Sequence, residues 1–154
     1  MINILFICHG NICRSPMAEF IFRDMVEKLG RGDEFNVASV ATSYEEIGSP
    51  VHRETARILD KLGISYSSKR ATHMEKSDYE KYDYLICMDS ANVRNTIRIA
   101  GDDKDKKIHK LLRFTGSDRD VSDPWYTGDF DSTYEDVKSG CEGLLKWLDN
   151  KNKQ

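Results

Sequence analysis

The sequence predicts an α/β fold with three layers: a four-stranded parallel sheet flanked by helices on both faces. Strand-like and helix-like segments alternate along the 154 residues. Two strand-like segments, residues 2–8 and 82–89, are largely apolar at successive positions, which is typical of strands buried on both faces. Because a helix that joins parallel strands makes a right-handed crossover, this alternation favours one parallel sheet.

The N-terminal half supplies two strands and two helices. After the strand at residues 2–8, Pro16 fits the first turn of a helix and Gly30 fits its end. Apolar residues between them recur at helical spacing, at Ala18, Ile21, Met25 and Leu29. Residues 35–41, "FNVASVA", predict the second strand, and residues 51–62 predict the second helix.

The C-terminal half continues the alternation. Residues 82–89 predict the third strand, residues 90–100 a helix that Gly101 closes, and residues 107–114, "KIHKLLRF", the fourth strand. The last helix carries an apolar stripe at Tyr134, Val137, Cys141, Leu144 and Leu148. Between them lies a long polar stretch, residues 115–132, and a loop of that length in a compact domain is more often functional than idle.

Composition narrows the class of protein. The chain carries 23 basic and 26 acidic residues, for a net charge of −3, so it offers no basic field for nucleic acid. The apolar run at the start is too short to cross a membrane. The four cysteines include no Cys-x-x-Cys and have no spacing that suits zinc. We expect one domain over residues 1–154, reduced thiols, no metal or cofactor, a cytoplasmic location and a monomer.

The loop after the first strand, "CHGNICRS" at residues 8–15, has the composition of an anion site. In open parallel sheets the ligand crevice lies beyond the carboxyl ends of the strands. Backbone N–H groups in such a turn, with a helix N-terminus behind them, bind a phosphate-sized anion. Gly10 is expected to let the backbone approach the ligand closely, and Arg14 can grip two phosphoryl oxygens.

The same surroundings predict a reactive thiol at Cys8. A helix N-terminus and a neighbouring cation lower the pKa of a cysteine from about 8.5 to roughly 3.5–7.5. Ser15 could donate its hydroxyl to that thiolate, and Asn11 could fix the loop through its amide. The patterns Gly-x-x-x-x-Gly-Lys-Ser/Thr and Gly-x-Gly-x-x-Gly are both absent, which argues against nucleoside triphosphate hydrolysis and dinucleotide binding.

The segment "FICHGNICRSPMAE" closely resembles the signature of the low-molecular-weight protein tyrosine phosphatases, a Cys-x5-Arg-Ser loop after the first strand. The resemblance continues in order along the chain, at "SVATS", "DYLICMD" and "SDPWYTG". It implies a four-stranded parallel sheet, no metal, and a two-step reaction through a cysteinyl-phosphate on a phosphotyrosine protein. It also implies that inorganic phosphate or a similar oxyanion can occupy the loop.

The resemblance assigns roles to individual residues. Cys8 matches the nucleophile, Arg14 the phosphate clamp and Asp123 the general acid. The chemistry needs such an acid, because a phenolate leaves more easily once protonated. Residues expected to bind the substrate are His9, Gly10, Asn11, Ile12, Cys13, Ser15, Tyr44, Trp125 and Tyr126. Ser39 is expected to support the loop.

The chain departs from the family pattern near the pocket wall and before the third strand. Tyr44 stands one position early for the usual aromatic residue, which leaves Glu45 and Glu46 at the rim. A trio of His, Ala and Arg that is common in the family appears here as Lys69, Ala71 and Thr72. A loop-supporting histidine therefore has no counterpart, and some member of that network must be replaced.

Three other functions compete with phosphotyrosine hydrolysis. A phosphoarginine phosphatase of the same family would favour Thr where this chain has Ile12. A thiol-coupled arsenate reductase would need a further cysteine pair after Cys87, and none is present. A non-catalytic phosphoprotein-binding module would be expected to lose one of the three catalytic residues. Cys13 shares the loop with Cys8, so we also expect a reversible disulfide between them under peroxide.

Overall fold

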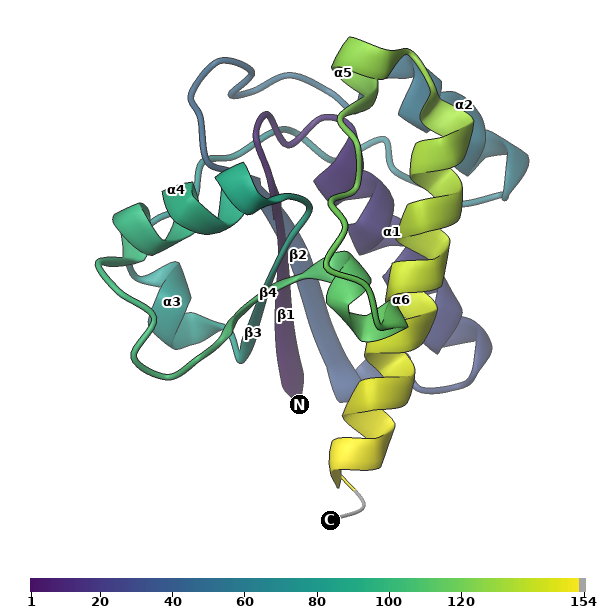
Figure 1. Ribbon diagram of the computed structural model, residues 1–154. Coiled ribbons are helices and arrows are strands. Elements are labelled where there is room, and N and C mark those ends of the chain that lie inside the picture. The colour runs from purple at the N-terminus through teal and green to yellow at the C-terminus, as the bar shows by residue number, and fades with distance from the viewer. Residues whose placement is uncertain (153–154) are drawn as a thin grey trace.

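The predicted fold class is confirmed by a computed structural model, which describes residues 1–152. The sheet has four parallel strands in the order β2-β1-β3-β4, and Figure 1 shows helices on both sides of it. Its strands are β1 (Ile2–Cys8), β2 (Phe35–Ala41), β3 (Tyr84–Cys87) and β4 (Ile108–Lys110). The α-helices are α1 (Arg14–Lys28), α2 (Arg53–Lys61), α3 (Asp78–Lys81), α4 (Ser90–Ala100), α5 (Pro124–Thr127) and α6 (Phe130–Asn152). Two 3-10 helices are η1 (Gly32–Glu34) and η2 (Leu111–Thr115).

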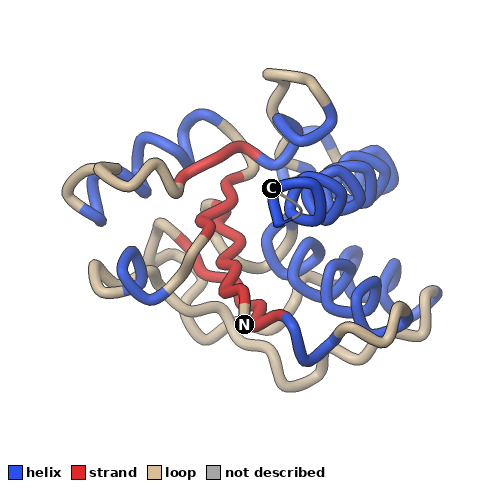
Figure 2. The backbone as a smooth tube through the Cα atoms, turned by 90° about the horizontal axis from the view of Figure 1, so that it is seen from below, coloured by secondary structure: helices blue, strands red, loops and turns tan. Residues whose placement is uncertain are grey.

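The apolar run of β1 is explained by burial on both faces. Ile4 and Phe6 are fully buried in a cluster with α1 and α6, while Leu5 and Ile7 are fully buried in the cluster that includes residues of α3 and α4. Figure 2 shows the strands running between the two helical layers. Since β1 is central and covered on both sides, its carboxyl end is held rigidly, and the loop that follows starts from a fixed point.

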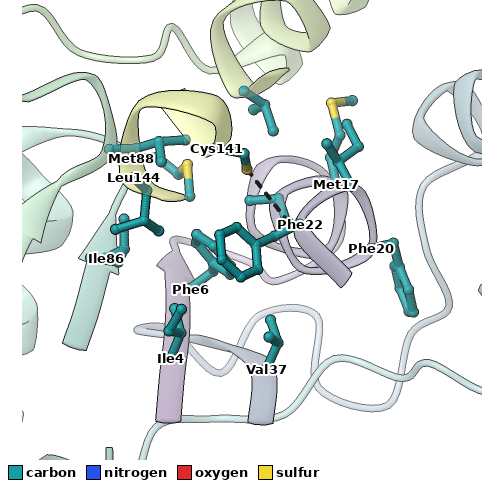
Figure 3. Close-up of a cluster of buried hydrophobic side chains, with 14 of the residues drawn as sticks. Ile4, Phe6, Met17, Phe20, Phe22, Val37, Ile86, Met88, Cys141 and Leu144 are labelled. Carbon is teal, nitrogen blue, oxygen red and sulfur yellow. Dashed lines mark hydrogen bonds between the residues drawn. The ribbon is translucent and has the colours of Figure 1, made fainter. Parts of the chain in front are cut away.

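The larger cluster lies between the sheet and helices α1 and α6. Phe6 and Phe22 lie with ring centroids 6.0 Å apart, and Figure 3 shows Cys141 of α6 pointing at α1 among the core side chains. Cys141 is fully buried, as the apolar stripe of the last helix predicts. This packing fixes α1, which carries the end of the loop, against the sheet.

The fourth strand is shorter than the sequence predicts. The expected strand at 107–114 is wrong in its second half, because β4 ends at Lys110 and η2 follows. Leu111 and Leu112 are consecutive, yet both are buried in the same cluster. Successive side chains of a strand point to opposite faces, so an extended backbone could not place both there, and a 3-10 turn can.

Among the described residues, no helix is both long and apolar enough to span a bilayer. The polar stretch 115–132 is less irregular than expected, because it contains α5 and the first turn of α6. The short helices η1 and α3 were also not predicted. Each has four residues or fewer, too short for a periodic pattern to show.

Gly143→Ala is expected to destabilise the fold although alanine normally favours a helix. A Cβ at position 143 would lie 2.4 Å from the backbone oxygen of Phe114. Alanine gains about 1 kcal/mol of helix propensity over glycine, but overpacking typically costs about 1–3 kcal/mol. Thermal unfolding should show a lower Tm, while Ser139→Ala on the exposed face of α6 should not lower it. An unchanged or higher Tm for Gly143→Ala would contradict this packing.

Candidate active site

The loop of residues 9–13 joins the central strand β1 to α1 at the carboxyl edge of the sheet. Its ends are tied down by neighbouring segments: Thr42 N–H donates to the Cys8 carbonyl at 3.1 Å and His52 N–H donates to the Ile12 carbonyl at 2.9 Å. The left-handed residue of the loop is Asn11, with φ of 60°, a conformation that asparagine tolerates better than most residues.

The close approach of Gly10 to a ligand stays a prediction, but Gly10 does not make the left-handed turn of the loop. Its φ is not positive, and a Cβ there would meet Glu46 Cγ at 3.5 Å, an ordinary contact. The tight turn therefore depends on Asn11 rather than on the glycine.

Cys8 ends β1 with its sulfur at the centre of the loop. The residue is 3% exposed. Its Sγ accepts a hydrogen bond from the Asn11 backbone N–H at 3.2 Å and lies 3.0 Å from Ser15 Oγ. Asn11 Nδ2 donates to Ser15 Oγ at 2.8 Å, so the hydroxyl hydrogen of Ser15 is free to point at the sulfur. Two hydrogen-bond donors are thus available to the sulfur.

Asn11 supports the loop through its whole side chain. The residue is 1% exposed, and its amide donates a second hydrogen bond to Ser39 Oγ at 2.9 Å. Its Oδ1 accepts from the Thr72 backbone N–H at 3.1 Å. The side chains of Asn11 and Ser15 therefore lie behind Cys8, and neither is among the residues that line the pocket.

Arg14 is buried at the start of α1 and points across the pocket. Its Nη1 donates to Asp89 Oδ2 at 2.8 Å and to the Val121 carbonyl at 2.9 Å, and its Nη2 lies 3.4 Å from Asp123 Oδ2. Burial opposes its charge, but the anions of Cys8, Asp123 and Asp89 outweigh burial and hold the pKa of Arg14 above its ordinary value. The guanidinium is thus a fixed cation.

Asp89 is a site residue that the sequence analysis missed. It follows β3 and caps α4, since its Oδ1 accepts from the Asn92 N–H at 2.7 Å, while its other oxygen holds Arg14. One carboxylate therefore orients a helix and a guanidinium together. A carboxylate at the carboxyl end of a buried strand, beside the strand with Cys8, was the available signal.

Asp123 stands at the edge of the pocket. It caps α5, its Oδ1 accepting from the Trp125 N–H at 3.0 Å, while Oδ2 faces Arg14. Its side chain is 25% exposed. Asp123 is thus held near Cys8 and Arg14 with one oxygen toward the pocket, as a general acid would require.

A small pocket of about 120 Å³ brings most of the predicted residues together. It is lined by Cys8, His9, Gly10, Ile12, Cys13, Arg14, Glu45, Glu46, Asp123, Trp125 and Tyr126. Trp125 and Tyr126 are 62% and 84% exposed, so they form an open aromatic side of the mouth. Tyr44 is not among the lining residues, because its ring stacks on His73 at a centroid distance of 3.7 Å.

The rim also carries two carboxylates. His9 Nε2 lies 3.1 Å from Glu45 Oε2, and both side chains are largely exposed. Glu45 and Glu46 therefore lie at the rim of the pocket, as the sequence predicts. No group of three His, Cys, Asp or Glu residues within the described part of the chain is arranged to hold a metal ion.

Comparison with known proteins agrees with this geometry. The family model of the low molecular weight phosphotyrosine protein phosphatases matches residues 3–154. The chain belongs to this family.

Relatives of the phosphatase cover nearly its whole length. It is 42% identical over 147 residues to the low molecular weight protein-tyrosine-phosphatase YfkJ of Bacillus subtilis, with 94% of each chain covered. It is 38% identical to PtpA of Staphylococcus epidermidis, covering 96% of this chain and 94% of that protein. The crystal structure of YfkJ superposes with a TM-score of 0.94 at 41% identity, covering 100% of this chain and 98% of that one. A Drosophila arginine phosphatase superposes with a TM-score of 0.85 at 25% identity, covering 94% and 96%.

Peroxide is expected to oxidise the phosphatase at Cys8 first. Burial, followed by the charge of Cys8, raises the pKa of Cys13 to about 12, and burial raises that of Cys87 to about 12 as well. These thiols stay protonated, so peroxide oxidises them slowly. Cys8 should become a sulfenic acid, which removes the sulfur anion that helps to raise the pKa of Cys13. Attack by Cys13 on the Cys8 sulfur should then form a disulfide and release water.

Mass spectrometry of the peroxide-treated protein after trypsin should locate this link, and a thiol reductant should restore it to two thiols. Sulfonic acid on Cys8 with Cys13 still free would contradict the prediction.

Proposed function

We propose that the chain hydrolyses phosphotyrosine in proteins without a metal, with Cys8 as nucleophile, Arg14 as phosphate clamp and Asp123 as general acid and base. The observation that carries the proposal is the shared pocket. Cys8 Sγ, held by the Asn11 N–H and Ser15, opens into the same small cavity as the Arg14 guanidinium and the Asp123 carboxyl group. We further propose a single catalytic domain that acts as a monomer in the cytoplasm.

In the first step the phosphate group of the substrate occupies the loop. Backbone N–H groups at the start of α1 and the Arg14 guanidinium neutralise its oxygens. The Cys8 sulfur attacks phosphorus, a sulfur–phosphorus bond forms, and the bond from phosphorus to the phenolic oxygen breaks. Asp123 gives its proton to the departing oxygen, so tyrosine leaves as the neutral phenol.

In the second step water hydrolyses the cysteinyl-phosphate. Asp123, now a carboxylate, takes a proton from the attacking water. A new oxygen–phosphorus bond forms, the sulfur–phosphorus bond breaks, and inorganic phosphate and the Cys8 thiolate remain. Asp89 keeps Arg14 aimed at the phosphoryl group in both steps, since it holds the guanidinium at 2.8 Å.

The walls of the pocket favour an aryl phosphate. Ile12, Trp125 and Tyr126 present apolar surface around the mouth, and aromatic side chains pack well against a phenyl ring. Arsenate reduction is disfavoured, because Cys87 and Cys141 are fully buried on different elements and offer no exposed pair.

Phosphoarginine is the second candidate substrate. Glu45 and Glu46 line the pocket and could face a guanidinium, and the Drosophila relative named as an arginine phosphatase has a similar structure. Ile12 offers no hydrogen bond to that group, so the aryl ester remains the favoured substrate.

Cleavage of p-nitrophenyl phosphate should persist in EDTA. Cys8→Ser and Arg14→Ala should abolish turnover, and Asp123→Asn should lower kcat by about 10²–10⁴-fold, the usual contribution of a positioned acid or base. The matched variants Arg119→Ala and Asp131→Asn, whose side chains are exposed, should keep the activity. Normal turnover by Cys8→Ser would overturn the proposed mechanism.

Rates on matched peptides should rank phosphotyrosine above phosphoarginine and phosphoserine. The aromatic side of the mouth should favour the phenyl ester, and the short phosphoserine chain should not reach the sulfur as well. A higher kcat/KM for phosphoarginine that falls in Glu46→Gln would instead assign the second substrate.

A further inference from the structure

A mostly buried lysine contacts residues that support the loop and is not among those that line the pocket. Lys69 comes from the segment between α2 and α3, and its side chain is only 13% exposed. Its Nζ donates to the backbone carbonyl of Ser39 at 2.8 Å and lies 3.7 Å from Glu19 Oε1. Burial lowers the pKa of Lys69, while the charges of Glu19 and Cys8 oppose that effect. Lysine is rarely buried without a paired charge.

Glu19 gives the hydrogen bonds under the loop a direction. A carboxylate can only accept, so the Ser39 hydroxyl must donate to Glu19 Oε1, at 2.6 Å. Ser39 Oγ is then left to accept from Asn11 Nδ2, and the same amide donates to Ser15 Oγ. Ser15 therefore directs its own hydrogen toward Cys8 Sγ.

Two cations stabilise the Glu19 carboxylate. Arg23 Nη2 donates to Glu19 Oε2 at 2.7 Å, and Lys69 faces Oε1. Arg23 is 40% exposed in its side chain, whereas Lys69 is much less so, and water screens a buried charge less. Lys69 thus supplies the less screened of the two positive charges on this carboxylate.

We propose that Lys69 is a positioning residue for the phosphatase reaction: with Glu19 it orients Ser39, Asn11 and Ser15 so that Ser15 donates to the Cys8 thiolate. This inference rests on the proposed function, and it explains why the loop-supporting histidine that the family pattern leads one to expect is absent. Lys69 occupies the sequence position that the family pattern gives to that histidine, and its ammonium contacts Ser39 and Glu19.

Other groups also act on the sulfur, and any pH profile must be assigned against them. The titratable and charged groups around Cys8 are His9, Cys13, Arg14, Glu19, Glu45, Glu46, Lys69, Cys87, Asp89 and Asp123. Among these groups only Lys69 is substituted, so the others are common to all the variants compared.

The test compares Lys69→Met, which keeps the length of the side chain but not the charge, with Lys69→Arg, which keeps the charge. Lys107→Met is the matched control, because Lys107 Nζ also donates to a backbone carbonyl, that of Tyr79, at 2.7 Å. The readouts are the acidic limb of kcat/KM against pH and the rate of Cys8 alkylation by iodoacetate, which only the thiolate undergoes.

Lys69→Met should move the acidic limb to higher pH and slow alkylation at pH 6 on the order of tenfold, as expected for the loss of support to a charged hydrogen bond. Lys69→Arg should keep the acidic limb and the alkylation rate close to those of the unchanged protein. Lys107→Met should match the unchanged protein in both. KM should change less than kcat, because Lys69 does not line the pocket.

Ser39→Ala gives a second route to the answer if Lys69→Met folds poorly, because it breaks the chain of hydrogen bonds and leaves the lysine in place. It should shift both readouts in the same direction. A Lys69→Met protein with a lower Tm but the pH limb and alkylation rate of the unchanged protein would overturn the proposal. Absence of phosphatase activity in the unchanged protein would instead overturn the proposed function, and the alkylation rates would still test Lys69.

Discussion

The site depends on the hydrogen bonds that surround one buried sulfur. Cys8 Sγ accepts from the Asn11 N–H and lies against the Ser15 hydroxyl, and an anion in a buried position is tolerable only with such donors and a nearby cation. Each donor is oriented by another group: Ser15 by Asn11, Asn11 by Ser39 and Thr72. The left-handed conformation of Asn11 is the local cost of aiming its N–H at the sulfur.

The fold supplies what these hydrogen bonds need, which is a rigid start and a rigid end for the loop. β1 has a neighbouring strand on each side and helices over both faces, and α1 packs against both the sheet and α6. The other site residues lie where neighbouring elements reach the same edge: Asp89 after β3 and Asp123 before α5. Arg14 joins them, because its guanidinium contacts Asp89, Val121 and Asp123.

Much of this was predictable from the sequence, and the rest was not for physical reasons. Local patterns predicted β1, β2, α4 and the loop, since burial on two faces and helical spacing both show in the order of neighbouring residues. The predicted end of β4 was wrong. Leu111 and Leu112 are buried together because α6 packs against them, and α6 is distant in sequence. The left-handed conformation of Asn11 was not predicted, since sequence does not show φ. Glu19 and Lys69 act through contacts between elements, and no local pattern marks such contacts. Asp89 also acts through such a contact, and its place at the end of a buried strand was the one signal for it. Tyr44 does not line the pocket because its ring stacks on His73, and this contact also joins segments that are distant in sequence.

The central claim is that the phosphoryl group passes through the Cys8 sulfur, and it is tested most directly by trapping the intermediate. The cysteinyl-phosphate forms readily from p-nitrophenyl phosphate, because that leaving group departs without a proton. Asp123→Ala should therefore slow hydrolysis of the cysteinyl-phosphate more than its formation. Acid quenching within the first turnover, followed by ³¹P NMR and fragment mass spectrometry, should find phosphorus bonded to the sulfur of Cys8. Phosphorus on the imidazole of His9, or no covalent adduct while the product is released in a burst, would contradict the account.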